Sequence, residues 1–156
     1  RYGFSDVLTA LLALDTFVEL YNGGTIRLSE FVRRKPDKDI LLSVIIRKEK
    51  RQFRYDSVRR TKTDFPVIAC AVVTGIVHGR ESWYISVGAR PMKAALLEKH
   101  WEIPDDASEE EIGRYAEEAA SEFTYGTNMR GSAEYRRHLT EVLLRREISS
   151  ILAERR

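Results

Sequence analysis

The chain contains few of the residues that cross-link or interrupt a fold, and it is nearly neutral. Its 156 residues include one cysteine, four prolines and nine glycines, and 26 basic against 24 acidic side chains leave a net charge of +2. A lone Cys70 excludes an internal disulfide and favours a reducing, cytoplasmic setting. The balanced charge provides no broad positive field, which argues against nucleic acid or an anionic membrane surface as a partner.

Long apolar runs are missing as well. The largely apolar stretch 7–14 is far shorter than the ~20 residues that cross a bilayer, and it lacks the basic flank and cleavage site of a signal peptide. We therefore expect no membrane span. The chain opens on Arg1 instead of a methionine, which suggests a fragment of a longer polypeptide.

What is present suits a globular domain. Hydrophobic residues make up 43% of the chain and charged residues 32%, enough to build one core without a metal or a disulfide. Near the start, Ser5 or Asp6 can cap a helix that runs to Leu14, because a short side-chain oxygen accepts from the unpaired amides of the first turn. Residues 16–28 then predict a β-hairpin around the turn 22–24.

The charged stretch 33–38 contains a proline and interrupts the pattern. We therefore expect a boundary near residue 36, with residues 1–36 as the tail of one region and residues 37–156 as a separate domain.

The middle of the chain predicts antiparallel strands. Alternating apolar residues at 40–46 and the run 52–56 flank a charged turn, so we expect these two strands to pair. Residues 67–73 are apolar at every position, as in a central strand covered on both faces, and residues 82–87 alternate as a neighbouring strand.

The last third of the chain predicts helices. Apolar spacing favours a helix over 94–101, a second helix that begins with a capping box at Ser108 and Glu111, and a last helix over 132–153. Strands followed by helices predict an α+β fold, in which an antiparallel sheet of three to four strands packs against about three helices. A short helix-hairpin tail precedes this unit.

No catalytic or metal-binding constellation stands out. His78, His100 and His138 lie far apart, with no cysteine or carboxylate at metal-ligand spacing. Cys70 lies in the most apolar stretch, where a thiol packs in the core and is a poor nucleophile. We therefore expect neither a catalytic residue nor a metal ligand in this chain.

Two segments read unlike generic core or surface: Arg60-Thr-Lys-Thr-Asp-Phe-Pro66 and Arg130-Gly-Ser-Ala-Glu-Tyr-Arg-Arg137. With Ser5-Asp6 ahead of an apolar helix, and with Val87-Gly-Ala-Arg-Pro91 read as a strand-to-helix junction, they occur in a characteristic order. Together they resemble the C-terminal domain of the FAD-binding subunit in the xanthine dehydrogenase and carbon monoxide dehydrogenase family of molybdenum hydroxylases.

The resemblance implies a cofactor-binding surface. In that family the aspartate matching Asp6 hydrogen-bonds a ribose of FAD, and the leucine matching Leu41 touches the flavin side of the cofactor. Ser5 and Arg60 are implied to belong to the same surface, with Arg60 pairing with Asp64 to hold the loop beside the flavin. The alternatives are that Asp6 is only a helix cap, Leu41 only a core residue, and the Arg60 pair purely structural.

The chain also departs from the family pattern. Asp56 stands where a lysine near the flavin is common, and Asn128 stands where an aspartate is frequent. The glycine-rich segments that hold the FAD pyrophosphate in this family are absent, so we expect this chain alone to bind FAD poorly or not at all. Arg136 and Arg137 are expected on the exposed flank of the last helix, where they could face an iron–sulfur partner.

The function implied by the resemblance is that of an oxidoreductase subunit. A molybdopterin centre in a partner would hydroxylate the substrate, and electrons would pass through 2Fe-2S clusters to FAD and then to NAD or another acceptor. The implied partners are an iron–sulfur subunit and a molybdopterin-binding subunit in a cytoplasmic hetero-oligomer, and this portion would be inactive by itself. The alternative is a non-enzymatic interaction or assembly module with the same fold and no cofactor.

Overall fold

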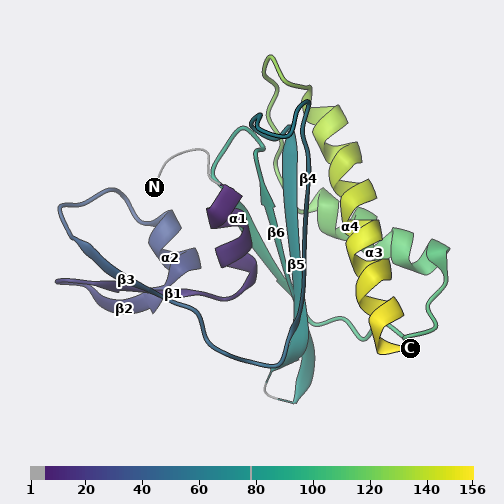
Figure 1. The fold of residues 1–156 in the computed structure, drawn as a ribbon, viewed down its shortest axis with the longest axis horizontal. Coiled ribbons are helices and arrows are strands. Elements are labelled where there is room, and N and C mark those ends of the chain that lie inside the picture. The colour runs from purple at the N-terminus through teal and green to yellow at the C-terminus, as the bar shows by residue number, and fades with distance from the viewer. Residues whose placement is uncertain (1–5, 78) are drawn as a thin grey trace.

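The computed structural model describes residues 6–77 and 79–156, which form two antiparallel sheets and four helices (Figure 1). The larger sheet has the strand order β4-β5-β6-β7, and the smaller sheet has the order β2-β1-β3. Helices α3 and α4 cover one face of the larger sheet, while α1 lies on its other face, between the two sheets. In chain order the elements are α1 (Asp6–Ala13), β1 (Phe17–Leu20), β2 (Gly24–Arg27), α2 (Leu28–Arg33), β3 (Leu41–Ile45), β4 (Gln52–Val58), β5 (Ile68–Val77), β6 (Arg80–Gly88), β7 (Ala95–Lys99), α3 (Glu109–Ser121) and α4 (Ala133–Arg155). The predicted α+β class is confirmed.

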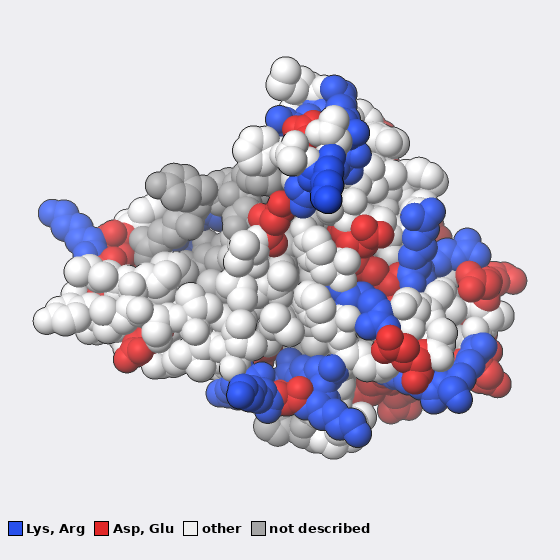
Figure 2. All heavy atoms as spheres, in the orientation of Figure 1, with Lys and Arg blue, Asp and Glu red and all other residues white. Residues whose placement is uncertain are grey.

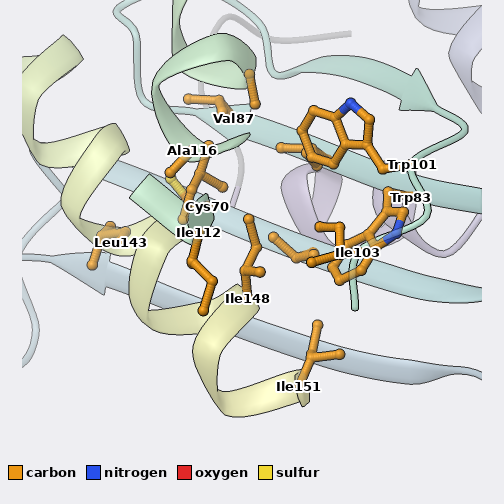
Figure 3. Close-up of a cluster of buried hydrophobic side chains, with 14 of the residues drawn as sticks. Cys70, Trp83, Val87, Trp101, Ile103, Ile112, Ala116, Leu143, Ile148 and Ile151 are labelled. Atoms are coloured by element: carbon orange, nitrogen blue, oxygen red, sulfur yellow. The ribbon is translucent and has the colours of Figure 1, made fainter. Parts of the chain in front are cut away.

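The main core lies between the larger sheet and the helices α3 and α4. Every residue of β5 from Ile68 to Thr74 is buried, because α4 packs on one face of the strand and α1 on the other. In Figure 3, Cys70, Ile112 and Ile148 meet in the layer between the sheet and the helices. The prediction of a central strand covered on both faces is confirmed.

The starts of the two long helices are also as predicted. The Ser108 hydroxyl accepts from the backbone N–H of Glu111, and the Glu111 carboxylate accepts from the backbone N–H of Ser108 at 2.8 Å. Ser132 caps α4 by accepting from the backbone N–H of Tyr135. Each cap satisfies amides that have no partner within the helix.

The helix predicted over 94–101 is wrong, because this segment forms β7. Its residues pair with β6, with Leu96 opposite Ser86 and Leu97 opposite Ile85. Both faces of the sheet are covered, so Leu96 packs toward α1 while Leu97 packs toward α3 and α4. The spacing of Ala94, Leu97 and Trp101 imitates a helical stripe, but the two leucines serve opposite layers. The expected strand-to-helix junction at 87–91 therefore joins two strands.

The predicted pairing of the strands at 40–46 and 52–56 is also wrong. Strand β3 pairs with β1, with Phe17 opposite Ile45 and Val18 opposite Val44, whereas β4 pairs with β5. The charged segment 46–51 therefore crosses from one sheet to the other. The domain boundary near residue 36 stays a prediction, although β3 lies after that residue and still belongs to the smaller sheet.

The N-terminal helix and hairpin agree with the sequence analysis. Helix α1 ends at Ala13, and β1 and β2 pair from Phe17 opposite Arg27 to Leu20 opposite Gly24. Gly24 adopts a φ of 64°, a backbone conformation that suits glycine in the tight turn. None of the described helices combines the length and the apolar character needed to cross a bilayer.

Candidate functional site

An ion pair between Asp6 and Arg59 joins the start of α1 to the end of β4. Arg59 Nη2 donates to Asp6 Oδ2 at 2.7 Å, and the other guanidinium nitrogens donate to the Asp64 carbonyl at 2.8 Å and to the Ser57 hydroxyl at 3.0 Å. The hydrogen bond to Asp6 raises the pKa of the Arg59 guanidinium. Asp6 is therefore held in place by a residue that is itself fixed at three points.

Gly88 sets how closely α1 approaches the sheet. A Cβ at this position of β6 would lie 2.0 Å from the Thr9 hydroxyl oxygen, which would force the helix away. Thr9 is fully buried as a result. Because Asp6 lies one turn before Thr9 on α1, the absent side chain of Gly88 also helps to place Asp6 beside β4.

Two polar atoms beside this ion pair are buried and have no hydrogen-bond partner within the described part of the chain: Asp6 Oδ1 and the Tyr55 hydroxyl. The Tyr55 hydroxyl faces Arg59 and Ser57 without reaching hydrogen-bonding geometry with either. Burial raises the pKa of Tyr55, so its hydroxyl stays protonated and able to donate. A buried polar group without a partner costs about 1–3 kcal/mol, which makes such groups markers of a ligand or water position.

The residues at this position fit the ribose of FAD. A carboxylate oxygen accepts from a sugar hydroxyl, and a phenolic hydroxyl both donates and accepts. Asp6 and Tyr55 supply one group of each kind beside Arg59. The alternative of Asp6 as a plain helix cap gains no support, since its bonded oxygen accepts from Arg59. Ser5 lies outside the described residues.

The expected pair of Arg60 with Asp64 is wrong. Arg59 is the residue that holds the loop after β4, and the Asp64 carboxylate lies 4.0 Å from Arg130. Arg60 is exposed and forms no ion pair with any residue in the described ranges. Two neighbouring arginines at a strand end point to opposite sides, and the sequence alone did not tell which one faces inward. A cofactor role for Arg60 stays a prediction.

Leu41 is not a core residue, because 47% of its surface is exposed at the start of β3. The register places Leu41 opposite Leu20 and Val44 opposite Val18, so both share the face that α1 and α2 cover elsewhere on the smaller sheet. Exposed large apolar side chains continue along this edge strand. We call them the β3 ledge, which comprises Ile40, Leu41, Leu42, Val44, Ile45 and Ile46. Such a continuous apolar edge is uncommon in proteins that act alone and is typical of a contact surface.

The structure does not bring Leu41 into contact with the Asp6–Arg59 pair. Figure 1 places β3 in the smaller sheet, at the left of the view, whereas the end of β4 that precedes Arg59 lies at the top. Asp6 stands between them at the start of α1. The candidate site therefore has two separate parts, a polar one at Asp6 and an apolar one on the β3 ledge.

Arg136 was expected on an exposed helix flank, and this is wrong, since only 1% of its surface is exposed. Its guanidinium donates to the Val67 carbonyl at 2.9 Å, to the Gly126 carbonyl at 2.8 Å and to Asn128 Oδ1 at 2.6 Å, and it also donates to the Gly131 carbonyl. A buried charge is tolerated when its donors are all engaged in this way. Arg137 is exposed, as predicted, and pairs with Glu141.

Sequence reasoning missed Glu147, which α4 presents to the core. Both carboxylate oxygens are buried and unpartnered among the described residues, and burial, reinforced by the nearby Asp56 charge, raises the pKa of Glu147 to about 8. Burial also raises the pKa of the Cys70 thiol, in agreement with its predicted core role. The available signal was the position of Glu147 between Leu144 and Ile148, inside the apolar stripe of the helix.

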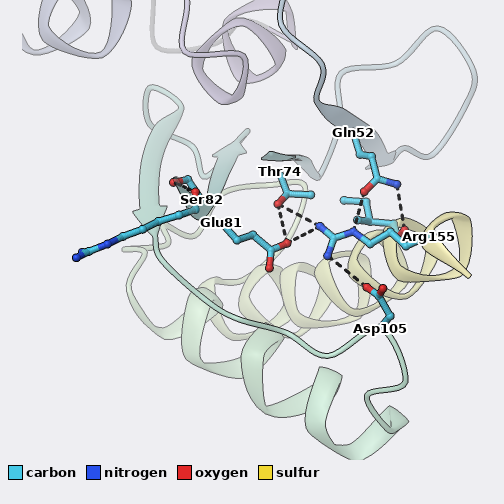
Figure 4. A network of polar contacts seen from close by, with 8 residues as sticks. Gln52, Thr74, Glu81, Ser82, Asp105 and Arg155 are labelled. Atoms are coloured by element: carbon cyan, nitrogen blue, oxygen red, sulfur yellow. Dashed lines mark hydrogen bonds and ion pairs between the residues drawn. The ribbon is translucent and has the colours of Figure 1, made fainter. Parts of the chain in front are cut away.

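A second polar network lies at the opposite end of α4 and joins its last turn to the sheet (Figure 4). Arg155 donates to Gln52 Oε1 at 2.9 Å, lies 3.5 Å from an Asp105 carboxylate oxygen and forms an ion pair with Glu81. The adjoining hollow of about 560 Å³ is lined by Lys50, Arg51 and Arg155 among others. Both arginines already pair with carboxylates, so the network is a structural tie.

Metal ligands are not clustered in the described ranges 6–77 and 79–156. No group of three or more histidine, cysteine, aspartate or glutamate side chains there could hold a metal ion. The His100 ring lies 3.1 Å from the Ser82 hydroxyl, and His138 lines an outer groove between α3 and α4. His78 lies outside the described residues.

Comparison with solved structures gives the same fold. Quinoline 2-oxidoreductase from Pseudomonas putida 86 matches with a TM-score of 0.72 at 18% identity, over 94% of this chain and 55% of that one. The Cu,Mo-CO dehydrogenase in its cyanide-inactivated form gives a TM-score of 0.73 at 19% identity, over 95% of this chain and 56% of that one. A CO dehydrogenase from Hydrogenophaga pseudoflava that lacks the Mo-pyranopterin moiety of the molybdenum cofactor gives 0.63 at 15% identity, over 90% and 57%.

The chain thus spans a little over half the length of the solved chains that it matches. A search of curated protein sequences found no match. The profile of the CO dehydrogenase flavoprotein C-terminal domain matches residues 53–151, which is well over half of the chain and runs from β4 into α4. This chain therefore belongs to the family of CO dehydrogenase flavoprotein C-terminal domains.

Proposed function

We propose that this chain is the C-terminal part of the FAD-binding subunit of a molybdenum hydroxylase. The observation that carries the proposal is the family match over residues 53–151. The fold likeness extends further, over 93–95% of the chain in three of the solved flavoprotein-type neighbours, and so includes α1 and most of the smaller sheet. The orphaned polar atoms at Asp6 and Tyr55 add local support.

The chain's own residues would bind and shield the cofactor. Asp6 accepts from a ribose hydroxyl with Tyr55 beside it, Leu41 keeps water from the flavin side, and Ser5 and Arg60 complete the surface. Bound FAD would supply reversible storage of one or two electrons. The chain contributes no proton donor or nucleophile to the hydroxylation, and its role is to fix the surroundings of the flavin.

The proposed assembly is a cytoplasmic hetero-oligomer. A molybdopterin-binding subunit would oxidise the substrate, and an iron–sulfur subunit with 2Fe-2S clusters would pass electrons to FAD, which reduces NAD or another acceptor. Support comes from the solved neighbours that are named as CO dehydrogenase and quinoline 2-oxidoreductase. The lone cysteine suits the reducing compartment.

The visible spectrum of the full-length protein tests this function. Gentle purification should yield a yellow protein with flavin absorption near ~450 nm and about one FAD per chain. A full-length protein that folds but carries no flavin, and takes up none when FAD is added, would contradict the proposal in favour of a cofactor-free assembly module.

The polar part of the site is tested by Asp6→Ala in the same full-length protein. Loss of a charge-assisted hydrogen bond should weaken FAD binding by about 1–3 kcal/mol, measured as the dissociation constant in a flavin fluorescence titration. Asp106→Ala is the matched control, because Asp106 is an exposed carboxylate just before α3. Equal FAD affinity in both variants would remove Asp6 from the site.

A further inference from the structure

The two loops that carry the family signature form one exposed tip. The loop at 59–66 presents Phe65, and the loop at 124–132 presents Met129, whose surfaces are 56% and 87% exposed. Tyr135, 47% exposed, stands beside them in the first turn of α4. The loops touch, since the Arg130 guanidinium lies 5.5 Å from the centre of the Phe65 ring. We call Phe65, Met129, Tyr135, Lys62 and Arg130 the signature tip.

Buried polar contacts hold this tip in one shape. Arg136 donates to backbone carbonyls at both loops, including Val67 and Gly126. Asn128 pairs with Gly131 in a short β-bridge, and its side-chain oxygen also accepts from the backbone N–H of Arg130 at 2.9 Å. A loop fixed in this way loses little conformational freedom when a partner binds, so its exposed side chains contribute more to affinity.

The charge around the tip is positive. Lys62 is exposed, and Arg130 lies 4.0 Å from the only nearby carboxylate of its loop pair, Asp64. Figure 2 shows Lys and Arg side chains gathered at this end of the molecule, with uncharged atoms above and beside them. Phenylalanine, tyrosine, methionine and arginine are the residues enriched at protein interfaces.

We propose that the signature tip is a docking surface for another subunit of the assembly, which offers an apolar recess bordered by carboxylates. Met129 and Phe65 enter the recess, while Lys62 and Arg130 face the acidic border. The inference rests on the proposed function, because the partner is one of the subunits with which the flavoprotein assembles.

A protein fits the tip better than a polyanion does. Binding of nucleic acid at physiological salt commonly uses six to ten phosphate contacts, roughly, whereas few cations surround the tip and the whole chain carries a net charge of only +2. The exposed side chains at the centre of the tip are apolar, which matches the core of a protein interface surrounded by a polar rim.

The test measures association of the full-length flavoprotein with its separately purified iron–sulfur and molybdopterin subunits by surface plasmon resonance. Met129→Ala should weaken the affinity for one of these subunits about tenfold, because a central apolar contact is lost. Lys62→Glu should slow the association rate several-fold at low salt and by less at high salt.

Matched controls lie at the opposite end of the sheet. Ile76→Ala removes an equally exposed apolar side chain, and Lys48→Glu reverses an exposed charge in the basic segment between β3 and β4. Neither control should change the affinity by more than about twofold. Equal effects in tip and control variants, or binding of both tip variants at wild-type affinity, would overturn the inference.

Flavin content separates the two proposals. If the wild-type protein holds FAD and the tip variants bind both subunits normally, the docking inference fails and the proposed function stands. If the wild-type protein holds no FAD and binds neither subunit, the proposed function itself fails. Tighter binding of the wild-type tip to a DNA duplex or to vesicles containing phosphatidylserine than to either subunit would also contradict a protein partner.

Discussion

The two sheets of this chain differ in how completely their apolar residues are covered. The larger sheet has α1 on one face and α3 and α4 on the other, and its central strands β5 and β6 are almost wholly buried. The smaller sheet is covered by α1 and α2 near β1, yet the β3 ledge on its edge remains exposed. The larger sheet therefore has its own complete core, whereas the smaller sheet presents an apolar strand to something else.

This difference separates folding from function. Residues that belong to the larger sheet stabilise the chain itself, and their loss should reduce the free energy of unfolding. Residues of the β3 ledge should contribute little to this chain alone and much more to the full-length protein. The ion pair of Asp6 with Arg59 lies between the two regions, because it ties α1 to β4.

The largest contrast is expected between Leu144→Ala and Leu42→Ala in the isolated chain. Leu144 is fully buried in the main core, so its truncation should lower the free energy of unfolding by about 2–5 kcal/mol. Leu42 is half exposed on the ledge, and its truncation should cost less than about 0.5 kcal/mol. Urea unfolding followed by circular dichroism measures both, and equal losses would erase the comparison.

Arg136→Met should be nearly as damaging as the core truncation, although it replaces a charged residue. The change leaves the carbonyls of Val67 and Gly126 and the side-chain oxygen of Asn128 without their donor, at an expected cost of about 3 kcal/mol. Arg137→Met, at the neighbouring exposed position, is the control and should lie within about 0.5 kcal/mol of the wild type. Thermal unfolding of the two variants distinguishes them, and similar midpoints would refute the buried role of Arg136.

The main core also carries a pH dependence through Glu147. Its pKa is raised to about 8 in the folded chain, against an ordinary value of 4.5. Between these pH values the folded protein keeps a proton that the unfolded chain releases, so the free energy of unfolding falls as pH rises and levels off above about 8. Each pKa unit corresponds to about 1.4 kcal/mol, so the loss amounts to a few kcal/mol.

Glu147→Gln should remove this slope. The variant and the wild type should be similar near pH 4.5, and the variant should be more stable by about 2 kcal/mol or more at pH 9, as measured by urea unfolding across the range. Glu154→Gln on the exposed end of α4 serves as the control. A variant whose stability parallels that of the wild type at every pH would show that Glu147 is ionised in the fold.

The smallest effect is expected for the tie between the two regions. Arg59→Ala removes the ion pair with Asp6, which is about one-third exposed, and should lower the free energy of unfolding by only about 1 kcal/mol. The same change should speed hydrogen exchange at the first amides of α1, because that helix loses its anchor to β4. Unchanged exchange in α1 would mean that packing against Gly88 alone fixes the helix.

The sequence predicted most of the larger sheet and its helices because their patterns are local. The apolar run at 67–73 and the capping box at Ser108 each specify an element without reference to distant residues. Strand β7 was missed because Leu96 and Leu97 serve two different layers, which only the completed sheet reveals. The partner of β3 was missed for a related reason, since strand pairing depends on contacts between distant segments.

The candidate site was predicted in part. The family motifs pointed to Asp6 and Leu41, and the structure gives Asp6 a buried free oxygen and leaves Leu41 on an exposed ledge. The inward roles of Arg59 and Arg136 could not be foreseen, because each stands beside a second arginine that could have taken its place. Tyr55 became visible only when its hydroxyl was found buried beside Arg59.

Hydrogen exchange in the full-length protein, with and without FAD, tests most directly whether this chain closes over the flavin. Addition of FAD to the apoprotein should slow exchange in the first turn of α1 and in residues 41–45 of β3, while α3, which lies on the far face of the larger sheet, should be unchanged. Protection of α1 and β3 alone is the predicted result. Binding of FAD with no change in either segment would contradict the account.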